Sequence, residues 1–350
     1  MPKDYQTRTQ AIRTRINPEN FSLNESFRNE LASISYSNVL TYIRMAMKGA
    51  DPAYTEKSKE AGQKVKNHLS EELEDVSYAY QGSVMTNTHI VGNSDIDLLV
   101  ICEKFYGYSY QPIMQVLNDY SNHWQYDQQN LAKLKAEVER PTYTGNALQD
   151  LANIRYDSEV ILKRVYEECD IKQPKAITIN NKSLKRLVDI VVASWYDDIQ
   201  SIINNKGDYR GIQIYNKAGH HYENPDYPFL SIKRINEKGL RTNGRLKKMI
   251  RFLKNVKADS DYDIALSSFD INAICYAIDE QTYAEKAFYQ LVPLLYQHLV
   301  RIAGDRFYAD TITSVDGREY IFKGKNEKHR HLQMLMQEVT SIASDLAIHL

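Results

Sequence analysis

Cysteine is scarce in this chain, and long apolar runs are missing from it. The three cysteines among 350 residues, Cys102, Cys169 and Cys275, lie far apart in apolar or helical surroundings. An odd count without paired spacing argues against a disulfide framework and a zinc motif, so we expect buried thiols. No apolar run approaches the roughly 20 residues that span a bilayer, and the first residues lack the apolar core of a secretory signal. We therefore expect a soluble, cytoplasmic protein without a membrane partner.

An excess of positive charge is also missing. The chain has 44 Lys and Arg residues against 45 Asp and Glu residues, which gives a formal net charge of -1. No global positive field draws such a chain onto nucleic acid, so we expect any polyanion site to be local and no long nucleic acid to be an obligatory partner. The length and a hydrophobic content of 43% are sufficient for two lobes.

The hydrophobic pattern predicts helices, then strands mixed with helices, then helices again. Apolar residues recur at three- and four-residue steps from about 24 to 73, which is typical of helices. Rich β-branched and aromatic content predicts strands at VSYAY (76–80), DIDLLVICE (95–103), KAITINN (175–181) and KRLVDIVVAS (185–194). Beyond about residue 200 the pattern is mainly helical. We therefore expect one domain over 1–200 and a second, mainly helical domain over 201–350.

Three aspartates stand where apolar strands are predicted. Asp95 and Asp97 flank Ile96 and point to one face of their strand, where they repel each other unless a divalent cation neutralises them. Asp189 is a single charge inside the apolar run RLVDIVVAS, where a carboxylate is costly without a partner. Magnesium held by all three carboxylates explains their placement. The alternatives are a turn cap at Asp95 with a solvent-facing Asp97, and an ion pair of Asp189 with Arg186 or Lys185.

Two further segments have the chemistry of a phosphate site. Gly82 and Ser83 follow the first predicted strand, where a glycine allows close backbone approach and the serine hydroxyl and N–H groups can donate to a phosphate. The segment GRLKKMIRFLKNVK (244–257) predicts a helix with one apolar face and a cationic stripe of Lys247, Arg251 and Lys254. A solvated basic face is the alternative interpretation of that stripe.

These motifs together resemble the DNA polymerase β-like nucleotidyltransferase superfamily. They are a Gly-Ser pair, an Asp-Ile-Asp that opens an apolar strand, and a third Asp on a later apolar strand. The helices ahead of the Gly-Ser turn, the chain length and the helical C-terminal half are similar to the cGAS/DncV-like nucleotidyltransferases, the CD-NTases of bacterial anti-phage (CBASS) signalling. The resemblance implies an α+β fold, with a mixed sheet flanked by helices as the catalytic core, a C-terminal helical domain, and the active site in the cleft of a bilobal molecule.

The same resemblance implies residue roles. Asp95, Asp97 and Asp189 would bind two Mg²⁺ ions, which Mn²⁺ can replace, and would be catalytic. The nucleotide would be bound by Gly82, Ser83, Arg251, Lys254 and Ser268, with Ser267 as the alternative to Ser268.

The implied reaction joins NTPs, ATP among them, into a cyclic di- or trinucleotide with release of pyrophosphate. The implied partner is an effector protein that is encoded nearby and binds the product. The alternatives are a nucleotidyltransferase of the same fold that acts on an RNA end or on a protein, an inactive nucleotide-binding homologue, and an interaction domain with fortuitous carboxylates.

Overall fold

The computed structural model describes residues 3–16, 38–90, 96–119 and 124–348. The chain divides into two compact units, and each is assembled from segments that are distant in sequence. Unit 1 comprises Met1–Thr55, Ser83–Ser94 and Arg234–Leu350, and unit 2 comprises Glu56–Gly82 and Asp95–Lys233. The predicted domain boundary near residue 200 stays a prediction.

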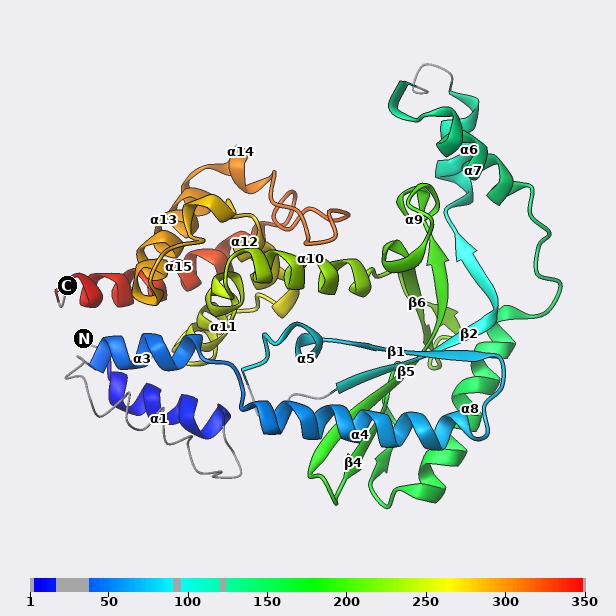
Figure 1. The fold of residues 1–350 in the computed structure, drawn as a ribbon, viewed down its shortest axis with the longest axis horizontal. Helices are drawn as coiled ribbons and strands as arrows, with labels where there is room; N and C mark the ends of the chain where they lie inside the picture. The colour runs from blue at the N-terminus through cyan, green and yellow to red at the C-terminus, as the bar shows by residue number, and fades with distance from the viewer. Residues whose placement is uncertain (1–2, 17–37, 91–95, 120–123, 349–350) are drawn as a thin grey trace. The chain divides into compact units, whose positions relative to one another are not determined.

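Unit 2 is built on a mixed β-sheet, drawn in cyan and green in Figure 1. Its strands are β1 (Val76–Gln81), β2 (Ile96–Tyr108), β3 (Cys169–Asp170), β4 (Ile177–Asn181), β5 (Arg186–Asp197), β6 (Gly211–Asn216) and β7 (His221–Tyr222). The order is β1-β2-β5-β4-β3, while β6 pairs with β5 and β7 pairs with β6. β2 and β5 are parallel, and the other pairs are antiparallel. The four strands predicted from the sequence are confirmed as β1, β2, β4 and β5.

Alternation along β2 and β5 gives the sheet two distinct faces. Ile96 and Leu98 are fully buried on one face, as predicted for Ile96. On that side Gly62 of α4 (Pro52–Ser70) lies so close to Ile96 and Tyr80 that a Cβ there would be 3.3 Å and 2.9 Å from them. The other face carries a small apolar cluster of Leu99, Ile101, Val191, Ala193 and Ile212. Burial on both faces fixes the register, because a one-residue slip would exchange them.

The remaining helices of unit 2 surround the sheet and its loops. They are α6 (Tyr110–Asn118), α7 (Gln128–Val138), α8 (Ala147–Val165), α9 (Ile199–Ile203) and the short 3-10 helix Gly207–Tyr209. α8 packs against β2, β5 and β6. Asp127 is the N-cap of α7, and its side chain accepts a hydrogen bond from the Asn130 N–H; Asn146 is the N-cap of α8 and accepts from the Gln149 N–H in the same way.

Unit 1 is helical in its described parts and has a large apolar core. The helices among its described residues are α1 (Tyr5–Ile16), α3 (Asn38–Met47), α5 (Ser83–Thr86), α11 (Arg245–Ala258), α12 (Ser268–Tyr276), α13 (Leu291–Gly304), α14 (Arg306–Ala309) and α15 (Asn326–Ala347), with 3-10 turns at Glu280–Thr282 and Phe288–Gln290. α10 (Pro228–Arg241) begins in unit 2 and continues into unit 1. α3 packs against α1, α11 and α15, so residues near the N-terminus share a core with the C-terminal helices.

The cysteines and the helix lengths bear on the expectations from composition. Cys102 and Cys275 are buried free thiols as expected, whereas Cys169 is only partly buried. Burial raises the pKa of the Cys275 thiol. None of the described helices is long and apolar enough to cross a membrane. The predicted α+β class, with a mixed sheet, flanking helices and a helical C-terminal region, is confirmed.

Candidate active site

Two of the three predicted aspartates are brought together by the parallel pairing of β2 with β5. Asp97 is the register partner of Asp189, although 92 residues separate them in sequence. Neighbouring strands lie about 4.8 Å apart, so the two carboxylates extend side by side from one face of the sheet. Both residues are partly exposed. Two adjacent carboxylates repel each other, and their hard oxygens are the ligands that Mg²⁺ prefers, so this pair fits a divalent cation. Asp95 lies outside the described residues.

Gly82 is fitted to the Asp97 carboxylate. β1 ends opposite Asp97, at its register partner Gln81, and Gly82 follows with a φ of 90°. A Cβ on Gly82 would lie 2.4 Å from Oδ2 of Asp97, which is closer than any real contact of this kind. Glycine is therefore required here both by the backbone conformation and by the space.

Ser83 is the first residue of α5 and belongs to unit 1. Its carbonyl oxygen accepts hydrogen bonds from the Thr88 N–H at 3.0 Å and from the Thr86 hydroxyl at 3.2 Å. These bonds close the chain back on itself directly after Gly82. The backbone after the Gly-Ser turn is thereby held in a compact turn, as a phosphate-binding segment requires.

Thr178 is a site residue that sequence reasoning missed. It is the register partner of Asp189 on β4, and its hydroxyl donates to Oδ1 of Asp189 at 2.5 Å. Within the described part of the chain, Asp189 makes no ion pair with Lys185 or Arg186; the Arg186 guanidinium instead donates to the carbonyl oxygens of Leu184 and Lys185. The alternative of a local ion pair at Asp189 is therefore wrong. No sequence signal marks Thr178, because only the strand register places it beside Asp189.

Arg251 and Lys254 lie in unit 1, on the predicted helix α11, and are 7% and 6% exposed. The alternative of a solvated basic face is thus wrong for these two residues. Arg251 donates to the carbonyl oxygens of Met47 at 2.8 Å and Asn87 at 2.6 Å, and Lys254 donates to that of Thr88 at 3.2 Å. Among the described residues neither has an acidic partner. Both cations bind the backbone of the segment that follows Ser83.

Burial of these cations has electrostatic consequences. It lowers the pKa of Lys254 to about 8 and that of Arg251 to about 10. His89 lies in the same environment, and burial, with the two nearby cations, lowers its pKa to about 4. Its ring contacts the Thr55 hydroxyl at 3.2 Å. A neutral histidine beside two cations without acidic partners leaves a local positive charge that suits an anionic ligand.

Ser267 and Ser268 begin α12. Ser267 is the N-cap, and its hydroxyl and N–H both bond Asp270 in a capping box. Ser268 is exposed and its hydroxyl is not used by the cap. The predicted contacts of Ser268, Arg251 and Lys254 with a triphosphate stay predictions. The structure thus groups Gly82, Asp97 and Asp189 in unit 2, and Ser83, Arg251, Lys254 and Ser268 in unit 1.

Comparison with known proteins identifies the family. A profile of the cGAS/DncV-like nucleotidyltransferase C-terminal helical domain matches residues 233–343. A c-di-GMP synthase from Capnocytophaga granulosa is 51% identical over 99% of this chain and 99% of its own length. The chain belongs to the cGAS/DncV-like nucleotidyltransferases. A second relative, a c-di-GMP synthase from a Lachnospiraceae bacterium, is 44% identical over 98% of this chain and 99% of its own length.

Solved structures of CD-NTases agree in fold. The structure of a STING-associated CdnE c-di-GMP synthase from Flavobacteriaceae sp. matches with a TM-score of 0.90 and 38% identity, covering 100% of both chains. The corresponding C. granulosa structure matches with a TM-score of 0.82 and 47% identity, over 99% of this chain and 100% of that one. The resemblance read from the motifs is therefore confirmed, and this CD-NTase is a nucleotidyltransferase that synthesises cyclic oligonucleotides.

Proposed function

We propose that this CD-NTase converts two molecules of GTP into cyclic di-GMP with release of two pyrophosphates. The observation that carries the proposal is the full-length similarity to relatives that are named c-di-GMP synthases. The paired Asp97 and Asp189 support an active enzyme over an inactive homologue, because both carboxylates are present and directly opposed. A target on RNA or protein has no comparable support.

The proposed site residues act in two groups. Asp97 and Asp189, with Asp95, would hold two Mg²⁺ ions, which would neutralise the phosphates and activate the attacking hydroxyl. Thr178 orients the Asp189 carboxylate through its hydrogen bond. Gly82 leaves room for the Asp97 carboxylate, because a Cβ there would meet its Oδ2. The triphosphate would be bound by Ser83, Ser268, Arg251 and Lys254. Arg251 and Lys254 also hold the backbone at 87–88 in place through hydrogen bonds to its carbonyl oxygens.

Each half-reaction is an in-line displacement. A ribose hydroxyl of one nucleotide attacks the α-phosphorus of the other, a new P–O bond forms, and the bond to pyrophosphate breaks while the hydroxyl loses its proton. Repeating the step with the roles exchanged closes the ring. Catalysis then depends on positioning and on charge neutralisation rather than on covalent chemistry by the protein.

We place this synthesis in the cytoplasm, as part of anti-phage signalling. Its partner is a protein encoded nearby that binds the cyclic product. Two solved relatives are described as STING-associated, so an effector related to STING is the partner that we propose.

Product analysis tests the proposal. The purified protein is incubated with GTP, ATP or both, with Mg²⁺, Mn²⁺ or EDTA, then treated with phosphatase, and resistant products are identified by mass spectrometry. We expect cyclic di-GMP from GTP alone, none in EDTA, and none from Asp97→Asn or Asp189→Asn. Asp157→Asn, which changes an exposed carboxylate on α8, is the matched control and should keep full activity. A main product containing adenine, or equal activity in all three variants, would contradict the proposal.

A further inference from the structure

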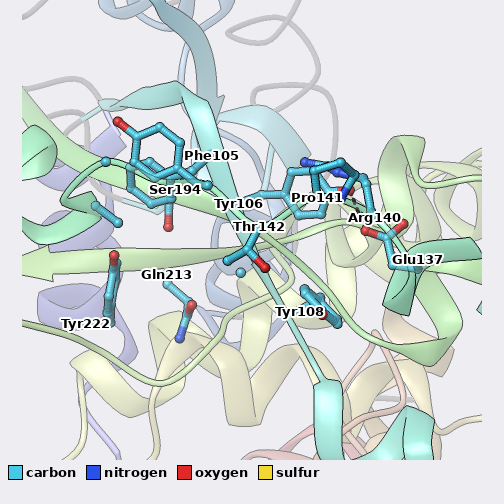
Figure 2. Close-up of a pocket in the computed structure, with 14 residues that line it drawn as sticks. Phe105, Tyr106, Tyr108, Glu137, Arg140, Pro141, Thr142, Ser194, Gln213 and Tyr222 are labelled. Atoms are coloured by element: carbon cyan, nitrogen blue, oxygen red, sulfur yellow. Dashed lines mark hydrogen bonds between the residues drawn. The ribbon is translucent and has the colours of Figure 1, made fainter.

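Unit 2 contains a cavity of about 290 Å³ that lies apart from the paired carboxylates. It is lined by the ends of β2 and β5, by β6 and β7, and by the segment 137–147 between α7 and α8, all within this unit (Figure 2). The lining includes Phe105, Arg140, Tyr143, Ser194, Gln213 and Tyr222.

The cavity opens on the face of the sheet opposite to the carboxylates. Ser194 follows Asp189 by five residues on β5, which is about 16 Å along a strand, and an odd offset reverses the face. Gln213 is the register partner of Ser194 on β6, so both side chains stand on the same face. A ligand here would not overlap the site of nucleotidyl transfer.

Ser194 presents a hydrogen-bonding group that nothing in the described chain satisfies. Its side chain is 0% exposed, and its Oγ has no hydrogen-bond partner there. A buried hydroxyl without a partner is costly and uncommon. Figure 2 shows this oxygen directed into the space between Tyr222 and Gln213. The hydroxyl is therefore an unsatisfied hydrogen-bonding group in the wall of the cavity.

Gln213 offers a second polar group beside it. Its Oε1 lies 2.7 Å from where a Cβ would stand on Gly107, so the glycine makes room for the amide. Its Nε2 reaches the Glu223 carbonyl oxygen only at 3.5 Å, the limit of a hydrogen bond. A hydroxyl and an amide on one face provide a donor and acceptor set that matches the edge of a purine.

The cavity is lined by aromatic rings and by an arginine, Arg140. Phe105 and Tyr143 stack with ring centroids 5.4 Å apart, and Tyr222 contributes another ring. The Arg140 guanidinium lies 4.0 Å from the centroid of the Tyr106 ring and has no acidic partner among the described residues. The nearby Glu137 is already paired with Lys206 at 3.2 Å. Aromatic faces stack on bases, and an arginine suits a phosphate.

We propose that this cavity is a second ligand site, which binds one purine nucleoside monophosphate. The base lies against the aromatic walls, its edge bonds Ser194 and Gln213, and its phosphate pairs with Arg140. The volume of about 290 Å³ lies just below the roughly 300–1,000 Å³ typical of ligand pockets, which suits one mononucleotide and excludes a cyclic dinucleotide. This site does not depend on the function proposed above.

Binding is tested where the catalytic site is disabled. Labelled AMP and GMP are titrated by equilibrium dialysis, in EDTA, into the full chain carrying Asp97→Asn and Asp189→Asn. We expect one molecule bound per chain, competition by unlabelled monophosphate, and no competition by inorganic phosphate at the same concentration. Arg140→Ala in that background should weaken binding about tenfold or more. Arg164→Ala, an exposed arginine at the far end of α8, is the matched control and should bind like the parent.

Ser194→Ala gives a readout that a structural role would not produce. Removing an unsatisfied hydroxyl should raise the midpoint of thermal unfolding of the empty protein, and yet weaken the monophosphate about tenfold. Loss of stability together with unchanged binding would overturn the assignment. So would the absence of a bound monophosphate in the carboxylate variant, or equal binding of CMP and UMP.

Discussion

Replacing Gly82 by alanine tests whether the turn before Ser83 is fitted to the Asp97 carboxylate. The substitution has two effects that can be separated. It places an L-residue at a φ of 90°, and it brings a Cβ to 2.4 Å from Oδ2 of Asp97. The first effect is a property of the backbone alone. The second acts on a residue that we assign to the metal site.

The magnitudes follow from these two effects. A residue forced to positive φ costs about 1–3 kcal/mol, which should appear as a loss in the free energy of unfolding. The steric contact is relieved only when the carboxylate or the strand moves by about 1 Å, and a displacement of that size in a catalytic group costs about 100-fold in rate. Gly82→Ala should therefore lower kcat about 100-fold while the protein stays folded.

A matched variant separates strain from contact. Gly324 has a φ of 72°, and a Cβ there would meet nothing within 4 Å. Gly324→Ala should show a similar loss of stability with normal turnover. The assays are urea unfolding and the rate of pyrophosphate release at saturating GTP. If Gly82→Ala turned over within about threefold of Gly324→Ala, the proposed fit between this glycine and the Asp97 carboxylate would be refuted.

Two further predictions concern residues around the site. Thr178→Val should lower the apparent affinity for Mg²⁺ about tenfold, because Asp189 loses its hydrogen bond. Thr178→Ser keeps the hydroxyl and should keep the affinity. Titrations of activity with Mg²⁺ that are equal in the two variants would contradict this role. Lys254 has a pKa lowered to about 8 by burial, so between pH 8 and pH 10 the unfolded chain binds more protons at this residue than the folded chain does. Lys254 therefore contributes a rise in the free energy of unfolding over that interval, and the difference in that free energy between the wild type and Lys254→Met should increase from pH 8 to pH 10, as measured by urea unfolding at each pH.

Much of the fold was accessible from the sequence because it depends on short-range patterns. Apolar residues at helical spacing mark α11, and β-branched runs mark β2 and β5. The isolated charge of Asp189 inside its strand predicted a metal shared with other carboxylates, and the structure places Asp97 at the same level of the sheet. Alternation along a strand is a local property, so Ile96 could be assigned to the core in advance.

Other parts of the site could not be predicted in this way. Thr178 bonds Asp189 only because β4 pairs with β5 in one register, and no local pattern encodes that register. Arg251 and Lys254 occupy the predicted helix, but their long side chains could have extended into solvent. The packing of unit 1 instead buries them against the carbonyl oxygens of Met47, Asn87 and Thr88. A stripe of cations on a helical wheel gives no indication of such burial.

By itself the sequence determined which residues are candidates for the chemistry: a glycine and serine at a turn, carboxylates at the start of an apolar strand, and one carboxylate inside another. The tertiary structure decided which of them meet. It pairs Asp97 with Asp189 across 92 residues and places Gly82 directly beside the Asp97 carboxylate. On the opposite face of the sheet it leaves the Ser194 hydroxyl without a partner among the described residues, in the wall of a cavity. The physical reason is that residue type and periodicity are local, whereas strand register and burial depend on contacts between segments far apart in the chain.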